Sequence, residues 1–397
     1  MNLEFDPEID TPATVAIVGG GPVGVEAALY ARFLGYSVLV FEAAKVGDRQ
    51  LAWGAVPMPG PWSEVTSALG RAALEAQGST GGWTSADVVP NHRQFVEEYL
   101  LPLARTDLLY DSMHIHAPVI SVSRTGCADA AQATAQRRAE QEFRVLIESQ
   151  QRGQFSQLVD IVLDCSGLQT GRGLASGGGM AVGESRLAEE ILPGKVDVLG
   201  KRRQQLADRH TLLFGRDASA IGNALDFTEL IAQSPQTRLT WIVPKDIATR
   251  DPLDLPAPAV GPAAERLGEL LANRYPGVVC LPAWGIESLQ QHDRGWSVRV
   301  QVGEEETLDL QAESLINCRT PRADWSFIAG LQLPGSIRDD GVSLEPHYYV
   351  LGEKGLGRPL SMVAAREQIR RAFALIGGRG DLDLYATIAQ HSLGTRK

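Results

Sequence analysis

The 397-residue sequence predicts an α/β protein that contains two strand–turn–helix–strand units of the doubly wound kind. Residues 14–42 and residues 211–243 each join an apolar strand to a helix through a glycine-containing turn and then return to a second strand. Strands connected in this way lie parallel and side by side in one sheet. The hydrophobic content of 44% is sufficient for the buried cores that such units need.

The first unit carries a glycine fingerprint. The apolar run Val15–Val18 is typical of a buried parallel strand, and it ends at the spacing Gly19-x-Gly21-x-x-Gly24. Gly19 permits a tight turn, Gly21 lets the backbone approach a pyrophosphate, and Gly24 lets the helix pack closely on the sheet. Pro22 suits the first turn of this helix, whose N-terminal N–H groups attract phosphate.

An acidic residue completes the first unit. The helix is expected over Pro22–Leu34, and the second strand over Tyr36–Phe41 ends at Glu42. This carboxylate lies eighteen positions after Gly24 (42 − 24 = 18), where it can accept hydrogen bonds from the ribose hydroxyls of an adenosine. The whole pattern predicts a bound dinucleotide, FAD.

The second unit departs from the fingerprint at one position. After the strand Thr211–Phe214 the turn begins at Gly215 and reaches Ala220, so it matches GxGxxA except that Asp217 replaces the middle glycine. A carboxylate near a pyrophosphate costs on the order of 4 kcal/mol at 4 Å and an effective dielectric constant of about 20, which would weaken nicotinamide binding. Alternatively the turn shifts outward and Asp217 caps the following helix.

Two cations follow the second strand of this unit. Lys245 and Arg250 come after Leu239–Val243, where a positive charge favours the 2′-phosphate of NADPH over NADH. The alternative interpretation is that both are ordinary solvated surface charges.

Composition excludes several classes of protein. The net charge of −11 and the absence of any basic run longer than Lys201–Arg203 argue against a nucleic-acid partner. The acidic N-terminus lacks a signal core and the apolar runs are too short to span a bilayer, so we expect no membrane partner and a cytoplasmic protein. The four cysteines form neither a CxxC pair nor a metal cluster: Cys127, Cys165, Cys280 and Cys318.

Two closely spaced histidines are candidate metal ligands. His114 and His116 would lie on one face of a strand expected over His114–Val122, but no carboxylate or cysteine accompanies them, so no metal site is expected. His347 could approach the cofactor, although a surface histidine is the alternative.

The remaining elements are assigned from periodicity and turn residues. Helices are expected over Ser63–Ala76, Asn91–Ala104, Ala263–Asn273 and Leu360–Leu375, and a short helical or hairpin insertion over Ala128–Glu142. Further strands are expected over Glu142–Glu148, Leu158–Leu163, Trp296–Val302, Thr307–Leu310, Ser314–Cys318 and Tyr348–Leu351.

Together these features resemble the flavoproteins with two dinucleotide-binding domains, which include thioredoxin reductase-like enzymes and class B flavin monooxygenases. Asp160–Gly167 is similar to the strand that ends in Ala-Thr-Gly at the first crossing between domains, and Leu315–Pro321 to the second crossing. Tyr349–Gly352 and the helix from Leu360 resemble the closing FAD segment, where the helix N-terminus faces the flavin pyrimidine.

The resemblance implies an FAD-binding Rossmann-like domain over residues 1–170 and 314–397, interrupted by a smaller NAD(P)-binding Rossmann-like domain over 171–313. The implied FAD contacts are Gly19, Gly21, Pro22, Gly24, Glu42, Trp53, Val119, Ser166, Gly167 and Gly352, and the implied NADPH contacts are Gly215, Ala220 and Lys245. Trp53 and Trp62 either flank the flavin or pack in the core.

The reaction is less defined than the fold. The missing CxxC excludes disulfide reduction in the manner of thioredoxin reductase, and the FxGxxxH fingerprint of monooxygenases is absent. We expect an FAD-dependent oxidoreductase reduced by NAD(P)H and reoxidised by oxygen or a small organic acceptor. Two alternatives stay open: a flavin oxidase or dehydrogenase reduced directly by its organic substrate, and a flavin-binding protein without turnover. The sequence identifies no catalytic side chain and no oligomeric state.

Overall fold

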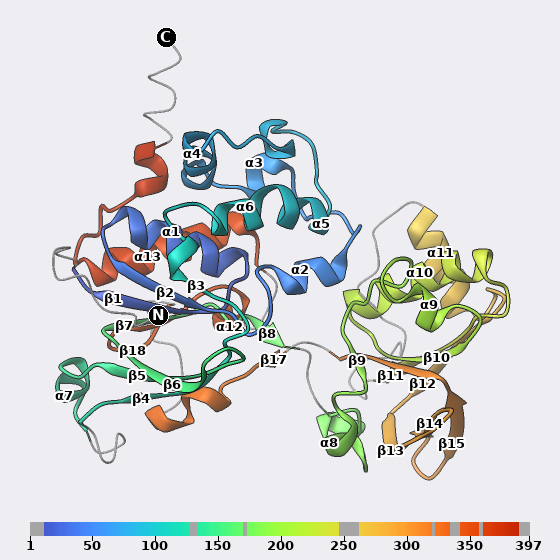
Figure 1. Cartoon of the computed structure of the whole chain (residues 1–397). Helices are drawn as coiled ribbons and strands as arrows, with labels where there is room; N and C mark the ends of the chain where they lie inside the picture. Colours follow the sequence, from blue (N-terminus) through green and yellow to red (C-terminus); the bar gives the residue numbers. More distant parts are fainter. Residues whose placement is uncertain are drawn as a thin grey trace. The chain divides into compact units, whose positions relative to one another are not determined.

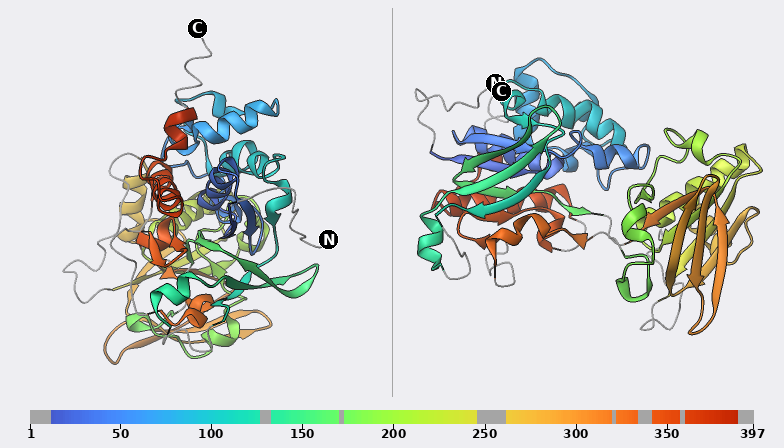
Figure 2. Two further views of the ribbon diagram at one scale, coloured as in Figure 1. Left: turned by 90° about the vertical axis from the view of Figure 1, so that its left-hand side faces the viewer. Right: turned by 60° about the horizontal axis from the view of Figure 1, so that its bottom comes forward.

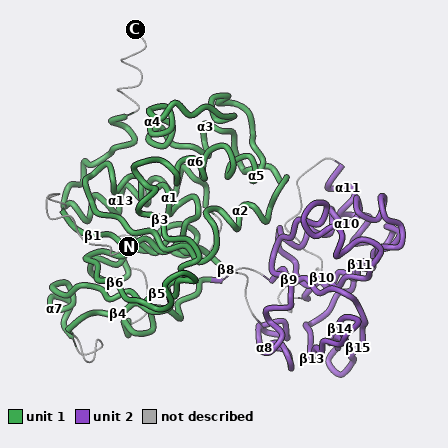
Figure 3. Tube along the Cα trace, in the orientation of Figure 1, with its two compact units in different colours: residues 1–168, 323–397 green, residues 169–322 purple. Residues whose placement is uncertain are grey.

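The computed structural model describes residues 12–126, 133–169, 173–245, 262–319, 322–333, 342–356 and 360–388. The chain divides into two compact units: unit 1 comprises residues 1–168 and 323–397, and unit 2 comprises residues 169–322 (Figures 1 and 3). The two crossings between them, β8 (Leu168–Gln169) and β17 (Arg322–Ala323), pair as a two-stranded ribbon. Unit 2 is therefore an insertion in the sequence of unit 1.

A six-stranded sheet forms the centre of unit 1, in the order β18-β19-β7-β1-β2-β3. β1 pairs in parallel with β2 on one side and with β7 on the other, and β7 pairs in parallel with β19. The strand order therefore reverses at β1, so a ligand crevice is expected outside the carboxyl ends of β1 and β7. The strands are β1 (Thr14–Val18), β2 (Ser37–Phe41), β3 (Met113–His114), β7 (Ile161–Asp164), β18 (Ser343–Glu345) and β19 (Tyr348–Val350).

Helices cover one face of this sheet and a second, antiparallel sheet covers the other (Figure 1). The helix α1 is buried almost all round, because it packs between the strands and α13. The helices are α1 (Pro22–Phe33), α2 (Asp48–Trp53), α3 (Trp62–Val65), α4 (Ala68–Ala76), α5 (His92–Phe95), the π-helical η2 (Val96–Leu100), α6 (Leu101–Ala104), α7 (Ala135–Ala139), α12 (Glu353–Leu356) and α13 (Met362–Ile376). The second sheet consists of β4 (Val119–Arg124), β5 (Phe143–Ser149) and β6 (Gly153–Val159).

The core of unit 1 encloses a carboxyl group on α1. Glu26 is 2% exposed, accepts a 3.5 Å hydrogen bond from Tyr99 through Oε2, and has no hydrogen-bond partner at Oε1. Burial raises the pKa of Glu26 above its ordinary value. The folded state thus binds this proton more tightly than the unfolded state, so the contribution of Glu26 to stability falls as pH rises above the ordinary carboxyl pKa.

Replacing Glu26 with glutamine should therefore raise the melting temperature by a few degrees at about pH 8, and the gain should shrink toward zero at about pH 4. Thermal denaturation at both pH values measures this difference. Glu75→Gln, at an exposed position on α4, is the matched control and should change neither value. An equal gain at both pH values would contradict a raised pKa of Glu26 in the folded protein.

Unit 2 contains a five-stranded parallel sheet in the order β12-β11-β10-β16-β9. Helices α10 and α11 pack on one face and the antiparallel strands β13–β15 pack on the other (Figure 2). The parallel strands are β9 (Leu192–Pro193), β10 (His210–Gly215), β11 (Arg238–Pro244), β12 (Val278–Ala283) and β16 (Ser314–Cys318). The other elements are α8 (Glu184–Leu187), α9 (Arg203–Leu206), α10 (Ala218–Gln233), α11 (Pro262–Leu271), β13 (Gly285–His292), β14 (Gly295–Gln301) and β15 (Thr307–Ala312).

The predicted fold class is confirmed, because both units are α/β and both are organised around parallel sheets. The domain boundary predicted at residue 314 needs correction. Ser314–Cys318, assigned to the first domain, forms β16 and pairs with β10 in register Leu212↔Leu315, so residues 314–322 belong to unit 2. A strand buried on both faces fits either parallel sheet equally well, which explains the error.

Three predicted elements are interrupted. His114–Val122 divides into β3 and β4 because His116 has a positive φ of 52°. Leu158–Leu163 divides between β6 and β7 at Asp160, whose carboxylate accepts the N–H of Thr14 at 2.8 Å. Ser63–Ala76 divides into α3 and α4, because Ser67 caps α4 by accepting the N–H of Gly70 at 2.7 Å. The capping residue Asn91 was predicted correctly.

Candidate functional site

The fingerprint turn of unit 1 lies at the carboxyl end of β1, where the strand order reverses. Gly19 has a φ of 108°, and a Cβ there would lie 2.7 Å from the carbonyl oxygen of Cys165. A Cβ on Gly24 would lie 1.9 Å from the carbonyl oxygen of Gly19. Both glycines are therefore required by the contact between the turn, the helix and β7.

Gly21 differs from its neighbours because it faces open space. A Cβ at this position would meet no atom within 4 Å, and no side chain caps the N-terminus of α1, which starts at Pro22. The first N–H groups of a helix have no partner inside the helix and attract an anion. The turn thus offers room and hydrogen-bond donors for a pyrophosphate, and this fits the dinucleotide predicted from the sequence.

Glu42 lies beside this turn at the end of β2. Its carboxylate accepts the N–H of Gly20 at 2.6 Å and the N–H of Ala44 at 2.7 Å. A carboxylate has about four lone-pair positions, so these two bonds fix its orientation and still leave acceptor capacity for ribose hydroxyls.

The exits of β7 and β19 form the opposite side of the site. Ser166 and Gly167 follow β7, and Gly167 has a φ of 70° that favours glycine. Gly352 follows β19 with a φ of 80°, and a Cβ there would lie 3.4 Å from Val23 in the first turn of α1. The N–H of Gly352 donates to Gln368 of α13 at 2.7 Å. Ser166, whose Cα would lie 3.2 Å from a Cβ on Gly19, and Gly352 therefore border the fingerprint turn, and Gly167 follows Ser166 in the chain.

The other two predicted FAD contacts lie on separate elements. Trp53 ends α2 and stacks on His92 at a ring-centroid distance of 5.5 Å. Burial lowers the pKa of His92 to about 4. Val119 is the first residue of β4, half-buried against the core of the second sheet. Trp62 is 2% exposed in the helical core, so the packing interpretation holds for this residue.

Sequence reasoning missed the charged groups near these exits. Arg49 of α2 donates to the carbonyl oxygen of Leu168 and lies 3.8 Å from Glu353, the first residue of α12. Lys354 and Asp164 form an ion pair whose side chains have no exposed surface. The sequence signal for this pair is Asp164 itself, an acidic residue at the end of the otherwise apolar strand β7.

The fingerprint turn of unit 2 holds Asp217 as a helix cap. Gly215 has a φ of 143°, and a Cβ there would lie 2.1 Å from the carbonyl oxygen of Cys318, so β16 closes on this turn as β7 does in unit 1. Asp217 accepts the N–H of Ala220 at 2.9 Å through Oδ1. The capping alternative is thus the one observed, and one N–H of the anion-binding turn is already occupied.

The predicted cation at the end of β11 has a backbone partner. Lys245 Nζ donates to the carbonyl oxygen of Val302 at 3.1 Å, whereas Arg250 lies outside the described residues. A second pair of cations follows β16. Arg319 and Arg322 both approach Gly178, and burial, together with the charge of Arg322, lowers the pKa of Arg319.

The described cysteines are poor nucleophiles. Cys165, Cys280 and Cys318 are all buried and unpaired. Burial raises the pKa of Cys280 to about 11 and also raises the pKa values of Cys165 and Cys318. Cys127 lies outside the described residues. Among the described histidines, cysteines and acids no group of three could hold a metal ion, and no described helix is long and apolar enough to cross a membrane.

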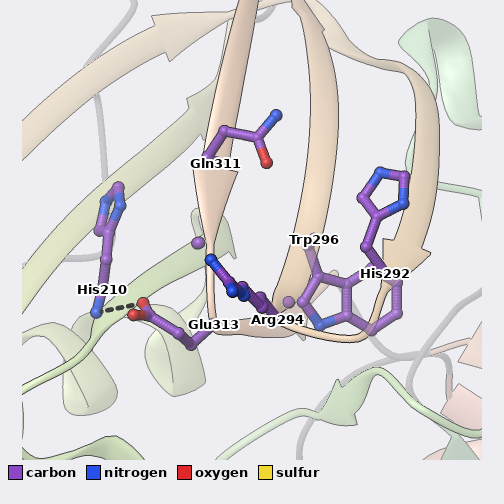
Figure 4. A pocket seen from close by; sticks show the side chains of 8 residues that line it. His210, His292, Arg294, Trp296, Gln311 and Glu313 are labelled. Carbon is purple, nitrogen blue, oxygen red and sulfur yellow. Dashed lines mark hydrogen bonds between the residues drawn. The ribbon is translucent and has the colours of Figure 1, made fainter.

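Two hollows of unit 2 lie at the other end of its sheet. One, of about 390 Å³, is lined by His210, Trp296 and Glu313 among others (Figure 4). The N–H of His210 donates to Glu313 at 2.8 Å. His210 begins β10 whereas Gly215 ends it, so this hollow lies away from the fingerprint turn of unit 2.

His347, the histidine that could approach the cofactor, precedes β19 in unit 1 and has a φ of 61°. It therefore lies at the amino end of this strand, away from the carboxyl edge of the sheet.

Comparison with known proteins identifies the fold. No protein-family model matches the chain, and no curated protein matches its sequence. Among solved structures, ornithine hydroxylase PvdA from Pseudomonas aeruginosa in its reduced form has a TM-score of 0.63 at 12% identity, over 92% of this chain and 98% of that one. The chain therefore shares its fold with this hydroxylase.

Two further structures share the fold but differ in reaction. The cadaverine monooxygenase DfoA from Erwinia amylovora, bound to FAD, has a TM-score of 0.59 at 15% identity over 92% of this chain and 94% of that one. The bacillithiol disulfide reductase Bdr (YpdA) from Bacillus cereus has a TM-score of 0.58 at 15% identity over 96% and 99%. Since a fold does not define a reaction, the activity must be argued from the site.

Proposed function

We propose that this protein is an FAD-dependent oxidoreductase in which unit 1 binds FAD and unit 2 binds NADPH. The observation that carries the FAD assignment is the open, uncapped turn at Gly21, flanked by glycines that backbone contacts require. When bound, FAD would supply the redox chemistry: NADPH would reduce it by hydride transfer, and oxygen or a small organic acceptor would reoxidise it, as in a monooxygenase.

The residues of unit 1 would bind and orient this cofactor. The N–H groups at the start of α1 would hold the pyrophosphate, and Glu42 would accept the ribose hydroxyls. Ser166 and Gly352 border the same turn from β7 and β19 and would hold the flavin end. In unit 2 the turn at Gly215 and the side chain of Lys245 would contact NADPH, and Asp217 would limit its affinity.

Disulfide reduction is not part of the proposal. The three described cysteines are buried, and the pKa of each thiol is raised, so thiolate formation is suppressed.

Anaerobic mixing of the purified flavoprotein with NADPH or NADH tests the donor. We expect the oxidised-flavin absorption band to bleach with NADPH, and more slowly with NADH. Exposure of the reduced flavoprotein to air should restore the oxidised-flavin band. Ornithine, cadaverine and simple alcohols should then be screened for faster recovery of this band and for consumption of the added compound. A flavin that stays oxidised with both nucleotides would contradict the NAD(P)H linkage.

A second candidate function is favoured by one observation, the Asp217 cap in the nucleotide turn of unit 2. If this carboxylate excludes the pyrophosphate, an organic substrate would reduce the flavin directly, as in an oxidase or dehydrogenase. Bleaching by an amine or alcohol in the absence of any nicotinamide nucleotide would support this candidate over the first.

A further inference from the structure

A lysine and an aspartate form an ion pair buried inside unit 1. Lys354 Nζ lies 2.7 Å from Asp164 Oδ2, and both side chains have 0% exposure. The hydroxyl of Tyr348 donates to the same carboxylate oxygen at 2.9 Å. The other oxygen, Oδ1, accepts the Oγ–H of Ser166 at 2.6 Å, and Lys354 Nζ donates to that Oγ at 3.2 Å. Ser166 is thus held by both members of the pair.

The same ammonium group contacts a segment that is distant in sequence. Lys354 Nζ lies 4.4 Å from the ring centroids of Trp325 and of Phe327. These residues come directly after the second crossing at Arg322–Ala323, whereas Asp164 and Ser166 come directly before the first crossing at Leu168–Gln169. One charge therefore ties together the two segments of unit 1 that flank the inserted unit.

This cluster also adjoins the fingerprint turn. Cys165, between Asp164 and Ser166, donates its N–H to the carbonyl oxygen of Val18 at 2.9 Å, and its own carbonyl oxygen is the atom that excludes a side chain from Gly19. On the other side, the N–H of Leu351 donates to the carbonyl oxygen of Asp164 at 2.9 Å. The ion pair therefore joins the exits of β7 and β19 where both border the predicted cofactor site.

Stability alone does not account for such a pair. Removing two charges from water costs several kcal/mol per ion, and apolar residues of similar volume often stabilise a core as well or better. A buried ion pair does, however, fix the relative geometry of the groups that it joins. Each buried donor or acceptor that loses its hydrogen bond costs free energy.

We propose that Lys354, held by Asp164, is a positioning residue for FAD. It fixes Ser166 and the β19 exit in the arrangement that the cofactor needs, without contacting solvent itself. This inference rests on the proposed binding of FAD in unit 1. It goes beyond that proposal by assigning part of the affinity to a buried pair rather than to the residues that line the site.

The test separates cofactor affinity from fold stability. FAD is removed from the holoprotein, and the apo-protein is titrated with FAD while flavin fluorescence and the visible absorption spectrum are recorded. Lys354→Met should raise the dissociation constant about 10- to 100-fold, as removal of an orienting group does at metal sites. The matched control is Lys195→Met in unit 2. Lys195 is 5% exposed and pairs with Asp226 within unit 2.

Both single variants should lower the melting temperature of the apo-protein, since each leaves a carboxylate without its cationic partner. The loss should be larger for Lys354→Met, because the side chain of Asp164 is fully buried whereas that of Asp226 is 29% exposed. Only Lys354→Met should weaken FAD binding and change the bound-flavin spectrum. If Lys354→Met does not fold, the double variant Asp164→Asn with Lys354→Met removes both charges, and it should still bind FAD at least about tenfold more weakly.

The outcomes are distinct. Wild-type protein that binds FAD while the Lys354 variants bind it within twofold of wild type would overturn this inference and leave the proposed function intact. Equal weakening by Lys195→Met would also overturn it, because the effect would then be one of stability. Wild-type protein that binds no FAD would overturn the proposed function and this inference together.

Discussion

Replacing Gly21 with alanine is expected to weaken FAD binding about 10- to 100-fold while leaving the stability of the apo-protein unchanged. Gly21 has φ −78° and ψ −176°, an extended conformation that alanine adopts without strain. Its Cβ would meet no protein atom within 4 Å. The methyl group would, however, occupy the space assigned to the pyrophosphate, and an extra methyl in a close contact costs about 1–3 kcal/mol.

FAD titration and thermal denaturation of the apo-protein measure the two effects separately. Gly24→Ala provides the contrast, because its Cβ would lie 1.9 Å from a backbone oxygen and should lower both stability and affinity. Gly268→Ala on α11, where a Cβ would also meet open space, is the neutral control for FAD binding. If Gly21→Ala binds FAD as tightly as wild type, the cofactor does not approach this turn.

Replacing Asp217 with glycine is expected to tighten NADP⁺ binding to the holoprotein at least about tenfold, since it removes a negative charge from the nucleotide turn of unit 2. Losing the helix cap to glycine should cost only a few tenths of a kcal/mol of stability. Asp217→Asn keeps an acceptor for the N–H of Ala220 and removes the charge, so it should tighten binding as well.

Calorimetric titration with NADP⁺ at low and high salt measures this effect. Repulsion between charges is screened by salt, so the advantage of both variants should shrink as ionic strength rises. Unchanged affinity in both variants would show that the dinucleotide avoids Asp217 or does not bind in unit 2. That result would favour the second candidate function, in which an organic substrate reduces the flavin directly.

The local parts of the fold could be predicted from the sequence. The spacing of Gly19, Gly21 and Gly24 encodes a turn between consecutive elements, and the strand, helix and acid that accompany it are contiguous in the chain. The structure places Glu42 beside this turn, as the spacing had indicated. The unit around Gly215 is equally contiguous in the chain, so its strand, turn and helix are predicted by the same spacing.

The long-range parts could not be predicted. Asp164 and Lys354 are 190 positions apart, and no periodic pattern links them. The strand Ser314–Cys318 is buried on both faces, so its sequence suits either parallel sheet. The sequence therefore does not indicate that its partner is β10 of unit 2. The break at His116 depends on a positive φ that histidine adopts only where its surroundings impose it.

The central claim is that unit 1 holds FAD, and the flavin content of the purified protein tests it most directly. The protein is denatured, and the released chromophore is separated and compared with FAD, FMN and riboflavin. We predict one FAD per chain, either as purified or after the apo-protein has been incubated with FAD. A protein that neither releases FAD nor takes it up would contradict the account.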